Sequence, residues 1–266
     1  MILAEPVGSC TDISATVLHP LREYSDTYRI APLTVLVDPA RARELLGEDA
    51  DPRLKFLFDN QLEEADLICF TKSDVSPEYP ALKGRSVRQM SARSGQGVAA
   101  WLDEALGGTL SAGSTILEID YEQYAQAEAA LAWLNLQGTI RPKTPSSPGA
   151  VLGPLLDRMD AELTSAGVMI VHLKAIIEAQ TGFVKAAVCG NGQQPAVEGN
   201  LDASPASVHE LLVNLRAVGE ASQVKTIVER DLQQMGWELE GLKIASFHPA
   251  PPQPERRTTG AGKATA

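Results

Sequence analysis

In the first part of the chain, short continuous apolar runs alternate with stretches whose apolar residues recur at helical spacing. The runs Leu33–Val37 and Leu67–Phe70 are the strongest, and residues 1–4 and Val87–Met90 form weaker ones. Continuous apolar runs are typical of strands that are buried on both faces of a sheet. Two helices are marked by apolar residues: Leu54, Leu57, Phe58 and Leu62, then Val98, Trp101, Leu102 and Leu106. This alternation predicts an α/β domain over residues 1–110, with a mostly parallel sheet covered by helices.

The pattern changes after a short linker of small residues. Residues 116–121 alternate apolar and acidic side chains, which predicts a half-buried strand, and a helix is expected over 125–132. From Trp133 onward the expected order of elements is β-α-β-β-β-α-β. This order resembles a ferredoxin-like α+β sandwich with one additional strand, over 114–248. The remaining residues, 249–266, are rich in Pro, Thr, Gly and Ala without apolar periodicity, and we expect a disordered tail.

Composition and charge argue against several classes of partner. The chain has 266 residues and a formal net charge of −11, whereas nucleic acids and anionic membranes favour a basic face. No apolar run approaches the ~18–20 residues that span a bilayer. The start of the chain has no basic region before Glu5, so no signal peptide is expected. The three cysteines, Cys10, Cys69 and Cys189, are odd in number and far apart, which favours a reducing cytoplasmic location over a disulfide framework.

Two short polar motifs each follow an apolar run. They are Thr71–Asp74 and Ser91–Ala92. A carboxylate such as Asp74 can accept the N1–H and the exocyclic amine of guanine as a bidentate pair, and adenine lacks that pattern of donors. The stem of Lys72 can lie across the base, and the backbone at Ser91–Ala92 can donate to the purine carbonyl oxygen. The alternative is a strand-to-loop turn with a solvated lysine.

A third motif lies near the start of the chain, where Glu5 precedes Gly8 by three positions. A carboxylate at the end of a strand can hold the water shell of Mg²⁺. The N–H of a glycine can approach a γ-phosphate because no Cβ stands in the way. These two residues are therefore the candidate catalytic pair. The alternative is a Pro-Gly turn that opens a helix.

The order of these motifs resembles the CobW/HypB/UreG group of P-loop GTPases, which are metallochaperones and cofactor-maturation proteins. The residues that carry the resemblance are Glu5-x-x-Gly8, Leu33–Asp38, Gln61–Ile68, Thr71–Asp74 and Ser91–Ala92. It covers the first 107 residues and implies a partial GTPase domain that binds GTP and Mg²⁺, with a metalloenzyme or cofactor-dependent enzyme as client. The implied base contacts come from Thr71, Lys72, Asp74, Ser91 and Ala92. The family usually has Asn in place of Thr71, whose hydroxyl lacks the two-sided reach of an amide.

Two features of that family are missing from this sequence. The first is the phosphate-binding loop G-x-x-x-x-G-K-[ST]; the stretch Gly260–Ala264 has the wrong spacing and follows no predicted strand. The second is a C-x-C-C metal-binding motif. By comparison with the family we expect the chain to begin at the third strand of the domain. This predicts impaired nucleotide binding, because charge-assisted hydrogen bonds to the phosphates are lost. The chain is then a truncated product, is completed by another polypeptide, or has repacked.

Two functions remain open, and the sequence leaves GTPase activity undecided. The first is a GTP-binding protein of the CobW type, impaired as it stands. The second is a non-catalytic module that binds a partner on a degenerate GTPase scaffold. The open sheet face of the second domain, which meets either water or a partner, is expected to carry five polar residues: His172, Lys174, Lys185, Asn214 and Arg216. A metal carrier that uses Cys10 and His19 has too few ligands to rank.

Overall fold

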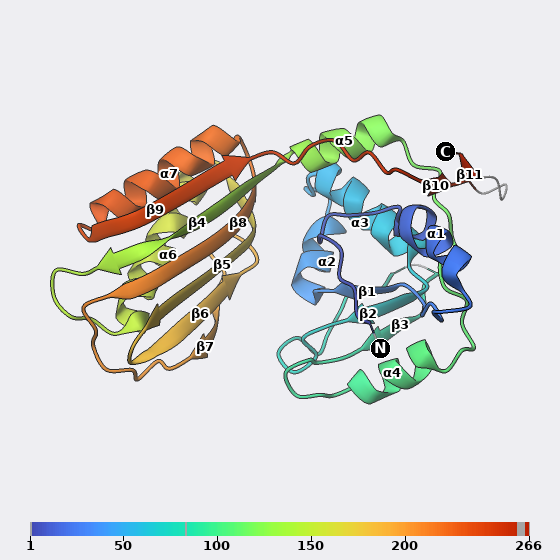
Figure 1. Cartoon of the computed structure of the whole chain (residues 1–266), viewed down its shortest axis with the longest axis horizontal. Coiled ribbons are helices and arrows are strands. Elements are labelled where there is room, and N and C mark those ends of the chain that lie inside the picture. Colours follow the sequence, from blue (N-terminus) through green and yellow to red (C-terminus); the bar gives the residue numbers. More distant parts are fainter. Residues whose placement is uncertain (1, 83, 260–263, 266) are drawn as a thin grey trace. The chain divides into compact units, whose positions relative to one another are not determined.

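The structure is a computed structural model that describes residues 2–82, 84–259 and 264–265. The chain divides into two compact units (Figure 1). The first comprises Met1–Ala127 together with Pro251–Ala266, and the second comprises Glu128–Ala250. The first unit therefore takes its last segment from the far end of the chain, whereas the second is contiguous.

The first unit is built on a three-stranded parallel sheet in the order β1-β2-β3. The strands lie on three of the predicted apolar runs and are β1 (Thr34–Val37), β2 (Leu67–Phe70) and β3 (Val87–Gln89). All four residues of β2 are buried, as its continuous apolar pattern predicts. The helices around the sheet are α2 (Pro39–Leu45), α3 (Pro52–Glu64) and α4 (Val98–Leu106). The predicted α/β alternation with a parallel sheet is confirmed for this unit.

Two of these helices begin at the same sequence signal, an aspartate followed by a proline. Asp38 caps α2 by accepting a hydrogen bond from the N–H of Ala40 (2.8 Å), and Asp51 caps α3 by accepting one from Arg53 (2.9 Å). A proline in the first helical turn has no N–H to satisfy, and its fixed φ suits the helix. The two caps therefore set where the chain leaves β1 and where it turns back toward β2.

Two predicted strands are absent from the described residues. Residues 2–6 have no regular structure, and Ile2 and Leu3 are each 77% exposed, while Met1 lies outside the described residues. A strand needs a paired neighbour for its backbone groups, and in the described sheet β1 pairs only with β2. Residues 116–120 are also irregular. Asp120 accepts a hydrogen bond from the N–H of Glu122 and caps helix α5 (Tyr121–Ala129), which begins where the strand was expected to end.

Residues 14–24 form one continuous helical segment made of three kinds of turn. It consists of a π-helical turn (Ser14–Leu18), α1 (His19–Leu21) and a 3₁₀ turn (Arg22–Tyr24). Asp12 lies just before it in a left-handed backbone conformation, with φ of +63°.

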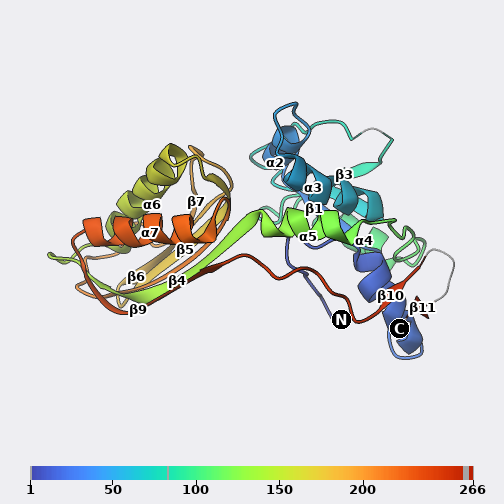
Figure 2. The same ribbon diagram turned by 90° about the horizontal axis from the view of Figure 1, so that it is seen from above.

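The second unit is a six-stranded antiparallel sheet in the order β7-β6-β5-β8-β4-β9, with two helices. The strands are β4 (Leu131–Arg141), β5 (Met169–Ala179), β6 (Gly182–Val188), β7 (Ala196–Gly199), β8 (His209–Val218) and β9 (Glu238–Phe247). Helices α6 (Pro148–Ser165) and α7 (Ala221–Gln234) lie on the same face of the sheet (Figure 2). The order of elements is the predicted one with β7 added. All four residues of β7 are exposed and carry no apolar pattern, which is why the sequence did not reveal it.

The hydrophobic core of this unit lies between the sheet and the two helices. Residues of β8 alternate between buried and accessible positions, and every second side chain, from Leu211 to Ala217, is at most 3% exposed. On α6 the buried residues recur at helical spacing: Val151, Leu152, Leu155, Leu156, Met159 and Leu163. Since side chains alternate along a strand, the other half of each strand points to the face opposite the helices.

The last described segment belongs to the first unit. Strand β10 (Arg257–Thr258) pairs antiparallel with β11 (Ala264–Thr265), within the range predicted to be disordered. Composition predicted disorder because the segment has few apolar residues. It did not reveal that Arg257 has a buried carboxylate partner in Asp12.

The stretch that superficially resembles a phosphate loop, Gly260–Ala264, lies outside the described residues apart from the backbone of its last residue. Within the described ranges, no helix is both long and apolar enough to cross a membrane.

Candidate functional site

Two of the predicted base-binding residues meet at the carboxyl edge of the parallel sheet. Asp74 follows β2 and Ser91 follows β3, and the Ser91 hydroxyl donates a hydrogen bond to the Asp74 carboxylate. This hydrogen bond is the main reason why the pKa of Asp74 lies below its ordinary value. Ser91 is fully buried, while Asp74 is exposed. The carboxylate is therefore oriented by the protein and has lone pairs left to accept donors from a ligand.

Lys72 lies at the same edge and forms an ion pair with Asp38, the residue that follows β1. Burial alone would raise the pKa of Asp38, but hydrogen bonds from Lys72 and Ala40 and the lysine charge lower it overall. Thr71 ties the loop to β1, because its N–H and its hydroxyl both donate to the carbonyl of Val37 (2.8 and 3.2 Å). Sequence reasoning missed Asp38 as a site residue. Its position directly after a strand of a parallel sheet is the signal that could have found it.

The loop after β3 is held by its own backbone. The N–H of Ser91 donates to the carbonyl of Gln96 (2.9 Å), and the N–H of Gly95 donates to the carbonyl of Ser91 (2.9 Å). The N–H of Ser94 donates to the Ser91 hydroxyl oxygen (3.1 Å). Because the N–H of Ser91 is already used, Ala92 is the member of the predicted pair that remains to contact a purine carbonyl oxygen.

Gly8 lies away from this edge. The carbonyl of Gly8 accepts a hydrogen bond from the Gln61 side chain (2.8 Å), and Gln61 belongs to the last turn of α3, which leads into the amino end of β2. Gly8 therefore lies on the amino side of the sheet, whereas Asp74 lies on the carboxyl side. A Cβ added at Gly8 would meet nothing within 4 Å, and Glu5 is exposed in the irregular segment. The structure does not bring Gly8, one member of the predicted catalytic pair, together with the predicted base-binding residues.

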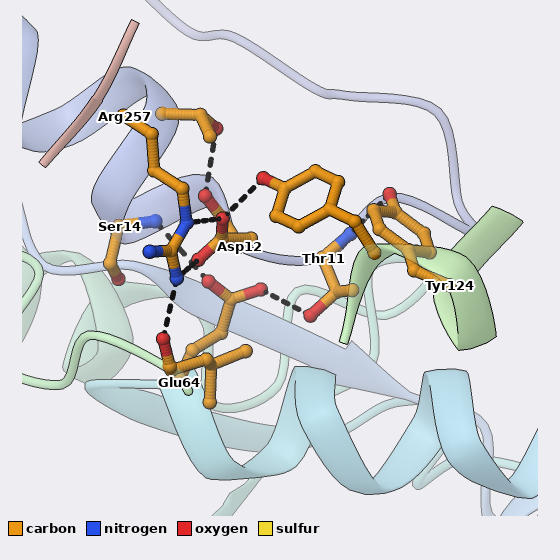
Figure 3. A network of polar contacts seen from close by, with 9 residues as sticks. Thr11, Asp12, Ser14, Glu64, Tyr124 and Arg257 are labelled. Atoms are coloured by element: carbon orange, nitrogen blue, oxygen red, sulfur yellow. Dashed lines mark hydrogen bonds and ion pairs between the residues drawn. The ribbon is translucent and has the colours of Figure 1, made fainter. Parts of the chain in front are cut away.

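A second polar cluster surrounds Asp12, whose side chain is almost fully buried (Figure 3). Arg257 Nε donates to Asp12 Oδ2 (2.7 Å), and the Tyr121 hydroxyl donates to the same oxygen (2.6 Å). Arg257 Nη2 also donates to Asp12 Oδ1 (3.3 Å) and to the carbonyl of Leu117 (2.6 Å). These contacts hold Asp12 in a backbone conformation that is unfavourable for residues other than glycine.

Glu64 extends this cluster from the end of α3 and is 1% exposed. Its Oε1 accepts from the Thr11 hydroxyl (3.0 Å), and its Oε2 accepts from the N–H of Ser14 (3.2 Å). Burial raises the pKa of Glu64 more than these two hydrogen bonds lower it. The N–H of Thr11 donates to the hydroxyl of Tyr124 (3.1 Å). Every carboxylate oxygen of Asp12 and Glu64 thus accepts a hydrogen bond, which fits a clamp between distant segments better than a substrate site.

A metal centre is not formed by the residues that the structure describes. In that part of the chain, no group of three or more His, Cys, Asp or Glu side chains could hold a metal ion. His19 Nε2 lies 2.9 Å from the carbonyl of Gly113, so this ring contacts backbone.

No family model matches the chain, and no curated protein matches it. Two solved structures are distantly similar. One is the Zn(II)-bound YjiA GTPase from E. coli, with a TM-score of 0.29 and 11% identity over 82% of this chain and 66% of that chain. The other is a Zn(II)-bound triple mutant of the YjiA GTPase, with a TM-score of 0.29, 13% identity and the same coverage. The chain therefore spans slightly less than two thirds of these structures. A likeness at this TM-score is too distant to assign the fold or the activity of this chain.

Proposed function

We propose that the carboxyl edge of the β1-β2-β3 sheet binds guanine and that the chain is a nucleotide-binding protein of the GTPase type. The observation that supports this most directly is the Asp74 carboxylate, which is oriented by Ser91 and exposed at the end of a parallel sheet. Ligands of open α/β sheets bind at this edge. The finer form of the proposal is a CobW-type role in the maturation of a metalloenzyme or cofactor-dependent client.

The chemistry of guanine matches the groups at this edge. Asp74 accepts the N1–H and the exocyclic amine, which lie side by side on the base. Adenine has an acceptor at N1, and a carboxylate repels it. The stem of Lys72 covers one face of the base while its ammonium group stays on Asp38. The N–H of Ala92 donates to the purine carbonyl oxygen.

The contacts predicted for the triphosphate and Mg²⁺ are not assembled at the carboxyl edge by the described residues, unlike those for the base. Gly8, the residue predicted to approach the γ-phosphate, lies on the amino side of the sheet, where it contacts Gln61. Glu5, the predicted magnesium residue, is exposed in an irregular segment. We therefore limit the proposal to recognition of the base and derive no hydrolytic step.

The test is a titration of the full chain with guanosine and adenosine nucleotides that carry a fluorescent label. We expect a preference for guanosine, and Asp74→Ala should weaken binding by about 10- to 100-fold, the loss of one charge-assisted bidentate contact. Asp74→Asn is the sharper variant. The asparagine amide offers one acceptor and one donor. Xanthine matches this pair, because its N1–H donates to the amide oxygen and its C2 carbonyl accepts from the amide NH₂. A switch of preference from guanine to xanthine cannot arise from misfolding.

The matched control is Asp59→Asn. Asp59 is an exposed carboxylate on α3 that pairs with Lys55, and it lies in the same unit. The Asp59→Asn variant should bind guanosine nucleotides as the unaltered chain does. Equal affinity for guanosine and adenosine nucleotides, or equal effects of the Asp59 and Asp74 variants, would overturn the proposal.

We also assign the second unit to the ferredoxin-like class. Apart from β6 and β7, the strand order is β5-β8-β4-β9, with α6 following β4 and α7 following β8. Both helices lie on one face, as that class requires (Figure 2). An experimental structure with a different strand order would contradict the assignment.

The second candidate function is a non-catalytic module that binds a partner. The open face of the antiparallel sheet favours it, because that face carries exposed apolar side chains such as Leu212 and Phe247. Binding through this face does not depend on guanine, so the two functions can be tested separately.

A further inference from the structure

The face of the six-stranded sheet opposite α6 and α7 has a defined arrangement of charge. Arg216 on β8 is directly opposite Trp133 on β4 and His172 on β5. One step along the strands, Asn214 is opposite Lys174. The residues between them on β8 and β5 are buried in the core, so this set shares the open face. Lys185 on β6 is opposite Ile176, one step further along β5, and belongs to the same face, as the sequence predicted.

One end of this face is basic and aromatic. The guanidinium of Arg216 lies 3.9 Å from the centre of the Trp133 ring, a cation–π contact. Phe247 on β9 lies beside Trp133, with ring centroids 5.9 Å apart, and is 42% exposed. Lys174 is exposed on the neighbouring strand. The stacked guanidinium is a preorganised cation that suits a carboxylate.

The middle of the face has an apolar pair of side chains with Lys185 and Lys243 beside it, and the other end is acidic. Leu212 and Ile176 pair across β8 and β5 and are 42% and 37% exposed. The next pair in the same direction is Glu210 with Glu178, and both are exposed. Two like charges directly opposite on neighbouring strands are destabilising. Arg141 on β4 lies at the same end, where it pairs with Glu240 and where its charge also acts on Glu210 and Glu238. One arginine does not balance these glutamates, so the remaining negative charge favours further cations from outside the unit.

We propose that this face binds the same face of a second copy of the chain. The two-fold axis runs across the strands, so that β8 of one copy lies over β8 of the other in the opposite direction. Arg216 and Lys174 of each copy then face the Glu210 and Glu178 pair of the other, and the apolar pair in the middle is shared. A two-fold axis along the strands would place like charges on like, which costs binding energy.

The size of the face suits such a dimer. Four of its strands have ten or eleven residues. At ~3.3 Å per residue and ~4.8 Å between strands, they cover roughly 600 Å². A stable interface buries ~800 Å² per partner, and β6 and the long side chains add to the figure.

The polarity of the face selects a second copy over other occupants. An acidic partner would cover the basic end and meet repulsion at Glu178 and Glu210. A basic partner would meet repulsion at Arg216 and Lys174. A second copy supplies both complements at the same time.

The test is sedimentation of the full chain and of two charge-reversed double variants through the micromolar range. We expect the unaltered chain to dimerise. Glu178→Lys/Glu210→Lys replaces the negative charges of the acidic end that face the other copy, and Lys174→Glu/Arg216→Glu replaces the positive charges of the basic end. Each variant alone should dimerise at least about 100-fold more weakly, because like charges then meet. A mixture of the two should form a heterodimer, which also shows that both variants fold.

The control is Asp157→Lys/Glu229→Lys, which changes the net charge as the first variant does but on the helices α6 and α7. It should leave dimerisation unchanged. A chain that stays monomeric, a dimer that survives both reversals, or a mixture that forms no heterodimer would overturn the proposal.

Discussion

Asp12 and Arg257 are 245 positions apart in the sequence, and their ion pair joins the start of the helical segment to the last described segment of the chain. The Asp12 side chain is 1% exposed and that of Arg257 is 23% exposed. A buried carboxylate without its partner costs more than the net gain that the pair contributes. The pair therefore matters mainly because Asp12 is already buried by its own strained turn.

Arg257→Gln should destabilise the first unit by about 2–3 kcal/mol, because Asp12 keeps its burial and loses its cation. The neighbouring variant Arg256→Gln is the control. It removes an exposed pair with Glu23 and should cost no more than about 1 kcal/mol.

The measurement is hydrogen exchange in peptides that span residues 11–24, with α6 of the second unit as the internal reference. We expect Arg257→Gln to speed exchange in residues 11–24 alone. Equal effects of the two arginine variants would show that Arg257 has no special role.

At the scale of elements, local signals located most of the helices and strands. The apolar run at β2 was found because all four of its residues are buried. The run at β1 also forms a strand, but it is only partly buried, and Leu36 is 57% exposed. The strands expected at 1–4 and at 116–121 were wrong within the described residues. Both have suitable side chains, but a strand exists only where another strand pairs with it, and that depends on the rest of the fold. Strand β7 was missed for the converse reason, since pairing with β6 creates it without any apolar pattern.

Asp51→Ala tests the cap of α3. We expect a loss of about 1 kcal/mol in the free energy of unfolding of the first unit, because the N–H groups of Arg53 and Leu54 lose their acceptor. Asp59→Ala, on the same helix, removes only an exposed ion pair and should cost less than about 0.5 kcal/mol. Urea denaturation compares the two, and equal losses would argue against the cap.

At the scale of the whole molecule, buried ionisable groups make stability depend on pH. His209 in the second unit is fully buried, and its Nε2 lies 3.1 Å from the carbonyl of Ala206. Its Nδ1 has no hydrogen-bond partner in the described part of the chain. Burial lowers the pKa of His209 below 6.5, because it outweighs the opposite effect of the neighbouring backbone of Ala206 and Ser146.

A lowered pKa means that the folded unit binds the proton less tightly than the unfolded chain does. The contribution of His209 to stability is complete above pH 6.5 and is lost as the pH falls from there through the folded pKa. Between these two pKa values, the free energy of unfolding changes with pH by at most about 1.4 kcal/mol per pH unit. His209→Gln should flatten this slope in urea denaturation of the second unit at several pH values. His172→Gln, on the open face, should leave it in place, and an unchanged slope in His209→Gln would contradict the assignment.

The candidate site shows the same division between local and distant information. The sequence identified Asp74, Lys72 and Ser91 because each follows a predicted strand, and neighbouring parallel strands end at one edge. It did not identify Asp38, which pairs with Lys72. It assigned Gly8 to the γ-phosphate of a bound nucleotide, and the structure places Gly8 beside Gln61, on the side of the sheet away from Asp74.

By itself, the sequence determined the α/β alternation of the first unit, two of its helices and the positions of two polar loops, while the Asp-Pro caps are local signals that the structure brought to notice. These depend on side-chain periodicity and on capping, which act over a few residues. Only the tertiary structure decided that Arg257 reaches Asp12, that Gly8 lies apart from Asp74, and that one sheet face has a basic and an acidic end. Such contacts join segments far apart in the chain, and the packing of the whole unit selects them, so no local pattern records them.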